Sequence, residues 1–178
     1  MTSTPEPTET TDERATDVIN QLAGIGFDAR FGQLRGQRPE IVRYAQSSYD
    51  ALLEPADLAG VSRYERDLIG LRVAQLTNTP ALTVWHRDRL RSLGASEADL
   101  ALIEGFPQQS GLSARQIAIL QHTDRLTRTP LLATAEHIAE LKAAGLTARD
   151  IVTISQLIAF LSFQLRTLVG LRILAEDV

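Results

Sequence analysis

The chain has 178 residues, a formal net charge of −4 and a pI near 5.4. This length is sufficient for one domain with a substantial core, while the acidic balance argues against sequence-independent nucleic-acid binding, which requires a basic surface. The sequence contains no cysteine, and this excludes disulfides, thiolate metal sites and cysteine nucleophiles.

The first 16 residues are rich in Thr, Pro and Glu, with neither a basic start nor an apolar run. They do not resemble a signal peptide, so we expect a mobile tail over residues 1–16, a single domain over residues 17–178, and a cytoplasmic protein.

Apolar residues recur at intervals of three and four along the rest of the chain, and strand-like alternation is almost absent, so we predict an all-α fold. Ser62 with Glu65 three residues later forms a capping-box pattern, and Pro39 suits the first turn of a helix. The expected helices cover residues 17–24, 39–53, 62–77, 80–94, 96–105, 113–128, 130–144 and 147 to the C-terminus, with a connector at 55–60 and a loop at 106–111.

A stretch of about 50 residues occurs twice. The first copy contains Leu76-Thr77-Asn78-Thr79-Pro80 followed by His86, Gly94, Ser96 and Asp99, and the second contains Leu126-Thr127-Arg128-Thr129-Pro130 followed by His137, Gly145, Thr147 and Asp150. Gly94 and Gly145 lie where a helix C-cap favours a left-handed residue, and Ser96 and Thr147 then suit N-caps. The repeat therefore predicts one helical hairpin used twice to close a shared core.

The last predicted helix is apolar on nearly all faces until its final turns. Its most apolar part, residues 157–174, is interrupted by Gln164, Arg166 and Arg172, and an arginine at the centre of a bilayer costs at least ~2.5 kcal/mol. We therefore predict a buried helix and no membrane partner. A helix that is apolar on most faces is either central to a domain or shared with another subunit, and we expect a homo-oligomer (a dimer, trimer or hexamer).

The pattern around the first copy resembles the carboxymuconolactone decarboxylase superfamily, in particular its alkylhydroperoxidase D-like branch. Members of that branch carry an acidic residue on one helix, a Cys-x-x-Cys pair starting twelve residues later, and a histidine four residues after the second cysteine. Asp67, Thr79, Leu82 and His86 occupy these four positions here. The resemblance extends over roughly residues 38–174 and implies an alkylhydroperoxidase D-like helical bundle built from two helical-hairpin repeats.

The two cysteines of that branch are replaced by Thr79 and Leu82. In the branch, one thiol attacks the peroxide and the other resolves the sulfenic acid as a disulfide. Neither a hydroxyl nor a hydrocarbon side chain can do this. The resemblance thus implies the fold and argues against cysteine-dependent hydroperoxidase activity.

His86 and Asp67 are the candidate catalytic residues. His86 would serve as a general acid and base, and Asp67 would fix its tautomer and orientation. In the alternative interpretation, His86 is a structural histidine bonded to Asp67 or to a backbone carbonyl, and Asp67 forms a surface ion pair with Arg63 one turn earlier.

Trp85, Thr79, Leu82 and Arg166 are the candidate substrate-binding residues. Thr79 could equally cap the helix that follows it, and Trp85 could pack in the core or an interface. Arg166 lies in the most apolar part of the last helix at a position where family members often carry arginine; a buried arginine requires an internal carboxylate, a neighbouring subunit or an anionic substrate as its partner.

Two functional hypotheses remain open. The first is a cofactor-free acid–base lyase or isomerase that acts on a small organic carboxylate or lactone, as the resemblance to carboxymuconolactone decarboxylase implies. The second is a non-catalytic scaffold or binding relative beside a cysteine-containing, peroxidase-like protein. We predict no metal and no cofactor, because His86, His122 and His137 do not share a helical spacing and the sequence lacks a phosphate loop, a dinucleotide fingerprint and a nucleophile elbow.

Overall fold

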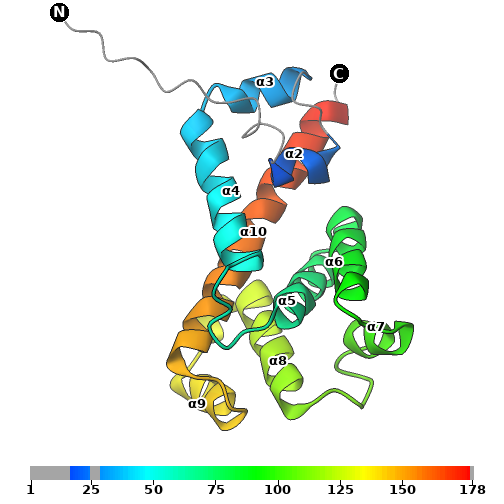
Figure 1. Ribbon diagram of the computed structural model, residues 1–178, viewed down its shortest axis with the longest axis vertical. Helices are drawn as coiled ribbons and strands as arrows, with labels where there is room; N and C mark the ends of the chain where they lie inside the picture. Colours follow the sequence, from blue (N-terminus) through cyan, green and yellow to red (C-terminus); the bar gives the residue numbers. More distant parts are fainter. Residues whose placement is uncertain (1–16, 25–28, 177–178) are drawn as a thin grey trace, which may run out of the picture.

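The computed structural model describes residues 17–24 and 29–176, and every regular element in these ranges is a helix (Figure 1). The elements are α2 (Val18–Ala23), α3 (Arg30–Gly36), α4 (Pro39–Leu53), α5 (Arg63–Leu76), α6 (Pro80–Ser92), α7 (Glu97–Glu104), α8 (Ala114–Arg128), the 3-10 turn η1 (Pro130–Leu132), α9 (Ala135–Ala143) and α10 (Ala148–Glu176). The all-α prediction is therefore confirmed. The tail predicted over residues 1–16 lies outside the described residues.

Helix α5 lies at the centre of the bundle. It packs against α6, α8 and α10. α6 follows α5 in the first hairpin, and α8 is the counterpart of α5 in the second repeat. α2 and α4 lie along the C-terminal half of α10, whereas α7 and α9 lie at the opposite end of the molecule (Figure 1). The first helices of the two hairpin repeats thus pack against each other and close a shared core, as the sequence repeat predicts.

The ends of these helices follow their capping signals. The Ser62 hydroxyl accepts the backbone N–H of Glu65 at 3.2 Å, and the Glu65 carboxylate accepts the backbone N–H of Ser62 at 2.8 Å, which is the predicted capping box. Gly94 and Gly145 have φ values of +96° and +87°, as their predicted place after a helix end requires.

Two parts of the sequence prediction are wrong. The single helix expected over residues 130–144 is divided into η1 and α9, because Leu131 and Leu132 are 97% and 67% exposed and give the first turn no buried face, and because Thr134 supplies a new N-cap. α3 (Arg30–Gly36) was not among the expected helices.

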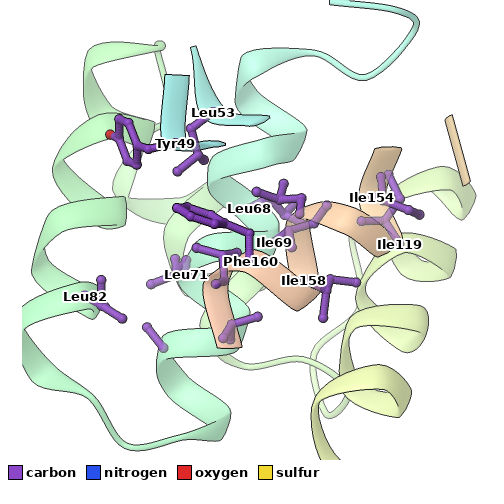
Figure 2. Packing of buried hydrophobic residues seen from close by; sticks show 14 of the residues in the cluster. Tyr49, Leu53, Leu68, Ile69, Leu71, Leu82, Ile119, Ile154, Ile158 and Phe160 are labelled. Carbon is purple, nitrogen blue, oxygen red and sulfur yellow. The ribbon is translucent and has the colours of Figure 1, made fainter. Parts of the chain in front are cut away.

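The core is formed where α4, α5, α6, α8 and α10 meet (Figure 2). Its residues include Tyr49, Leu53, Leu68, Ile69, Leu71, Leu82, Ile119, Ile154, Ile158 and Phe160, all at most 8% exposed. Burying each of these large side chains contributes roughly 1.5–3 kcal/mol before entropy is counted. The core therefore fixes how α5 and α6 face each other.

α10 is 29 residues long, and Ala148–Leu174 has the length and the mean hydropathy, 1.6, of a helix that could cross a membrane. Its inner face carries Leu157, Ile158 and Leu161, each at most 1% exposed and packed in the core. The central helix of a folded domain meets the same length and hydropathy criteria, so the composition of α10 is weak support for a membrane span.

Candidate functional site

α5 carries three charged side chains that are almost completely buried, at positions 66, 67 and 72. Buried charges require partners. Arg66 donates to the backbone carbonyls of Leu52, Leu58 and Val61 at 2.7–3.0 Å and so ties the connector between α4 and α5 to the bundle. Arg72 forms a bidentate pair with Asp124, with both N···O distances at 2.6 Å. Arg66 and Arg72 therefore have structural roles, which leaves Asp67 as the buried charge of α5 that could take part in a functional site.

Asp67 connects α5 to α6. Its Oδ1 atom lies 2.9 Å from Nδ1 of His86 and accepts the Nε–H of Arg89 at 2.7 Å. Arg89 also pairs with Glu54, at 2.5 Å from Nη1 to Oε1, and Glu54 lies 3.6 Å from Arg63. The result is a chain of alternating charges that ends on the imidazole of His86.

The His86 ring is held with one nitrogen engaged and the other without a partner. A carboxylate oxygen only accepts hydrogen bonds, so Oδ1 of Asp67 accepts from Nδ1–H of His86 as it does from Arg89, and in the neutral imidazole Nε2 then carries the lone pair. Nε2 of His86 and Oδ2 of Asp67 are both buried without a hydrogen-bond partner among the described residues. Such groups are costly unless something pairs with them.

Gly70 makes room for this ring. A Cβ atom added at Gly70 would lie 2.3–2.5 Å from three atoms of the His86 imidazole. A glycine inside a helix costs about 1 kcal/mol relative to alanine, and here the close approach of the histidine explains it. α5 and α6 therefore meet at a place shaped for the imidazole.

Burial and charge also affect the groups around the dyad. Burial alone lowers the pKa of the Arg89 guanidinium, but its hydrogen bonds to Asp67 and Glu54 outweigh burial, so that pKa is raised and the charge is retained. Burial raises the pKa of Tyr49, with Arg89 opposing that shift, so its phenol keeps its proton. Figure 2 shows the Tyr49 hydroxyl at the edge of the apolar cluster, pointing away from it.

A groove of about 680 Å³ lies beside the dyad, between α2, α6 and the end of α10. Its lining includes Trp85 and Arg89 from α6, Leu22 from α2 and Arg172 from α10. Asp67 and His86 are 0% and 1% exposed and do not line it. Arg89 joins the two places, because it lines the groove and donates to Asp67.

The other predicted site residues lie in three different environments. Trp85 is half-buried at the groove and also packs against the core. Leu82 is 1% exposed and belongs to the apolar core. Thr79 is buried at the N-cap position of α6, but its hydroxyl bonds to the Thr77 hydroxyl at 3.1 Å and makes no cap to the helix.

Two sequence interpretations need correction. Arg166 is exposed on α10, not buried, and it has no ion-pair partner among the described residues, because the apolar pattern of α10 hides which of its faces is turned outward. The alternative pairing of Asp67 with Arg63 is also wrong: Asp67 faces the inside of the hairpin and Arg63 pairs with Glu54.

Sequence reasoning missed Arg89, Glu54 and Gly70. Arg89 follows His86 by three residues on the same helix, so it lies near that histidine, and this spacing is the signal that could have identified it. Gly70, one turn after Asp67 inside a predicted helix, was a second available signal. Within residues 17–24 and 29–176, no three His, Asp or Glu side chains are grouped as a metal ion would need.

Comparison with known proteins identifies the fold. No family model and no curated protein sequence matches the chain. Among solved structures, an uncharacterized peroxidase-related protein from Silicibacter sp. TM1040 superposes with a TM-score of 0.70 at 18% identity, over 91% of this chain and 83% of the other. An uncharacterized peroxidase-related protein from Ralstonia eutropha JMP134, described as an alkylhydroperoxidase AhpD core, gives a TM-score of 0.70 at 19% identity, over 93% and 86%.

The fold is alkylhydroperoxidase D-like. This confirms the fold that the sequence resemblance implies. At these identities the likeness concerns the arrangement of helices. The chemistry of the site depends on the side chains of this chain.

Proposed function

We propose that this protein is a carboxymuconolactone decarboxylase-like acid–base enzyme, without thiol peroxidase chemistry, that moves a proton on a small carboxylate or lactone. One observation carries the proposal. His86 is bound to Asp67 through Nδ1 at 2.9 Å, while its buried Nε2 has no partner among the described residues. A histidine held in this way has the arrangement of a general base.

In this mechanism, His86 accepts a proton from the substrate at Nε2 and returns it to another atom. The carboxylate of Asp67 stabilises the imidazolium that forms, and Arg89 keeps that carboxylate in place through its bond to Oδ1. A positioned acid or base of this kind contributes roughly 10²–10⁴-fold to a rate. Neither step uses a thiol.

The groove next to the dyad supports the choice of substrate class. The indole of Trp85 offers an apolar surface, and the guanidinium of Arg172 lies on the same groove with no ion pair among the described residues. A small molecule with an apolar body and a carboxylate matches this lining. Entry to Nε2 of His86 would pass Arg89, which separates the groove from the dyad.

The second candidate is a non-catalytic scaffold or binding protein, acting beside a cysteine-containing, peroxidase-like protein. It is favoured by the burial of Asp67 and His86, at 0% and 1% exposure, and by their absence from the lining of the groove. In that case the dyad would be only a buried link between α5 and α6.

Turnover of a panel of small carboxylated lactones separates the two candidates. We expect activity in the wild type, a loss of about 10²-fold or more in His86→Ala, and normal activity in His137→Ala, which changes the corresponding histidine of the second repeat. Unfolding curves for the three proteins show whether the loss reflects folding. Activity unchanged in a folded His86→Ala protein would contradict the proposal, and so would turnover of an alkyl hydroperoxide by this cysteine-free chain.

A further inference from the structure

The chain of charges that ends on His86 has one link that is weaker than the others. Glu54 is shared between two arginines, with one oxygen 2.5 Å from Nη1 of Arg89 and the other 3.6 Å from Nη1 of Arg63. The side chains of Glu54 and Arg63 are 33% and 47% exposed, whereas that of Asp67 is completely buried. Ion pairs open to solvent contribute little to stability, but a buried pair is costly to break. Arg89 can therefore release Glu54 far more easily than Asp67.

The guanidinium of Arg89 also has room for a further acceptor, because it carries more N–H donors than it uses. Its Nε–H is donated to Asp67 and its Nη1 lies against Glu54, while Nη2 makes no hydrogen bond among the described residues. Nη2 is not one of the buried polar atoms without a partner in this part of the chain, so it is in contact with solvent. Once Glu54 leaves, the edge formed by Nη1 and Nη2 can hold a carboxylate in the bidentate way that a planar guanidinium favours.

We infer that Arg89 binds the carboxylate of a small-molecule ligand in the groove, and that Glu54 holds the same edge of the guanidinium until that ligand displaces it. On binding, Glu54 exchanges Arg89 for Arg63, its second partner, so no carboxylate is left without a cation. Asp67 keeps its bond to Nε of Arg89, so His86 keeps its orientation. Arg89 is then the residue that selects a carboxylate, and Glu54 is an internal competitor that sets the affinity.

The lining of the groove supports this kind of ligand. Arg89 and Arg172 both line it. Its one acidic residue, Asp88, is already bonded to Arg91 at 2.8 Å, so the charges open to a ligand are positive. The rest of the lining is mostly apolar, and Trp85 is its largest side chain. A ligand with one carboxylate and an apolar body is therefore favoured over a cation or a neutral polar molecule.

The exchange at Arg89 rests on the proposed function for its purpose, because the ligand that displaces Glu54 would be the substrate on which His86 acts. Its test measures binding and not turnover. A protein in which His86 is not catalytic could still bind a carboxylate through Arg89, and a catalytic His86 could act on a substrate that leaves Glu54 in place. The two proposals can therefore fail separately.

The fluorescence of Trp85 measures binding directly, because this residue is the only tryptophan of the chain and lines the groove. The probe is cyclohexanecarboxylate, which has an apolar body and does not absorb where tryptophan is excited, and cyclohexanecarboxamide is its neutral counterpart. We expect the wild type to bind the carboxylate roughly tenfold or more tightly than the carboxamide. Equal affinity for the two, or no binding of the carboxylate by either fluorescence or calorimetry, would overturn the inference.

Glu54→Gln tests the competition. The amide has no charge and holds Arg89 less strongly, so we expect this variant to bind cyclohexanecarboxylate about three- to fivefold more tightly than the wild type. Glu104→Gln is the matched control, because it removes the same charge from a carboxylate that pairs with Arg87 of α6 outside the groove. Its affinity should equal that of the wild type. A folded Glu54→Gln protein that binds no more tightly than Glu104→Gln would show that Glu54 has only a structural role, and would overturn the inference.

Arg89→Lys tests the arginine itself. A lysine keeps a positive charge near Asp67 but has no planar fork for a second carboxylate, so binding of cyclohexanecarboxylate should weaken roughly tenfold. Unfolding curves show whether the variant is folded. Arg172→Gln is the comparison, because Arg172 lines the same groove. Affinity that is lost in Arg172→Gln and unchanged in Arg89→Lys would place the carboxylate on Arg172 and overturn the inference.

Discussion

The two hairpin repeats place their corresponding histidines in opposite environments. In the first repeat, His86 lies in the middle of α6 at 1% exposure, bonded to Asp67. In the second repeat, His137 lies in the first turn of α9, where its Nδ1 accepts the backbone N–H of Thr134 at 3.0 Å. The histidine that looks repeated in the sequence is buried and oriented by a carboxylate in one hairpin and caps a helix in the other.

The difference begins on the first helix of each hairpin. Counted from Thr79 and Thr129, the position of Asp67 corresponds to Ile117, and that of Gly70 corresponds to Leu120. Leu120 is completely buried in the core. The first repeat thus leaves space and supplies a carboxylate where the second fills the space with hydrocarbon. A repeated backbone does not imply a repeated site.

Removing the carboxylate should have the largest effect. Asp67→Ala leaves the buried Nδ1 of His86 and the partly buried Nε of Arg89 without their shared acceptor, and breaking a buried pair in this way costs about 3–5 kcal/mol. Denaturant unfolding of wild type and variant measures the loss. Asp99→Ala, which removes the exposed capping carboxylate of α7, is the control and should cost much less. Equal losses in the two variants would mean that the dyad contributes no more than a helix cap.

Filling the space at Gly70 should have the next largest effect. In Gly70→Ala the added methyl group overlaps the His86 ring, so the imidazole must move away from Asp67, and overpacking of this kind costs about 1–3 kcal/mol. Gly170→Ala in α10 is the control, because a Cβ atom added there meets nothing within 4 Å. If Gly70→Ala were as stable as the wild type, the close approach of the ring would not be required by the fold.

What could be predicted from the sequence was mostly local. The capping boxes at Ser62 and Ser113 and the left-handed Gly94 and Gly145 depend on neighbouring residues, so short patterns identify them. The Asp67–His86 pair came from a spacing known in related proteins. That spacing says which residues face each other across a turn.

What could not be predicted depends on directions in space. Arg89 binds a carboxylate 22 residues earlier, across the hairpin, whereas its sequence neighbour Asp88, which pairs with Arg91, was an equally good candidate partner. Arg166 was expected inside the fold because α10 is apolar all round, and such a helix gives no sign of which face is outward. The break at Thr134 followed from exposed leucines, which a pattern of apolar residues reads as buried.

The effect that is smallest near neutral pH concerns the buried histidine of the second repeat, His122, which has a serine in place of a carboxylate. Its Nε2 lies 3.0 Å from the hydroxyl of Ser155, whose own proton goes to the carbonyl of Ile151, and its Nδ1 is buried without a partner among the described residues. Burial lowers the pKa of His122 from 6.5 to about 4, with smaller contributions from Arg125 and His137. A protonated His122 would therefore be an unpaired charge inside the fold.

The sign of the pH dependence follows from that shift. Between pH 6.5 and about 4 the unfolded chain holds the His122 proton and the folded chain does not, so the free energy of unfolding falls as the pH falls, by at most about 1.4 kcal/mol per pH unit. His122→Leu should remove this slope and leave Ser155 still bonded to Ile151, whereas His137→Leu should retain it. Denaturant unfolding at several pH values measures both slopes. A slope unchanged in His122→Leu would show that the proton is taken up by another group on unfolding. The buried His122 would then not be the source of the pH dependence of stability.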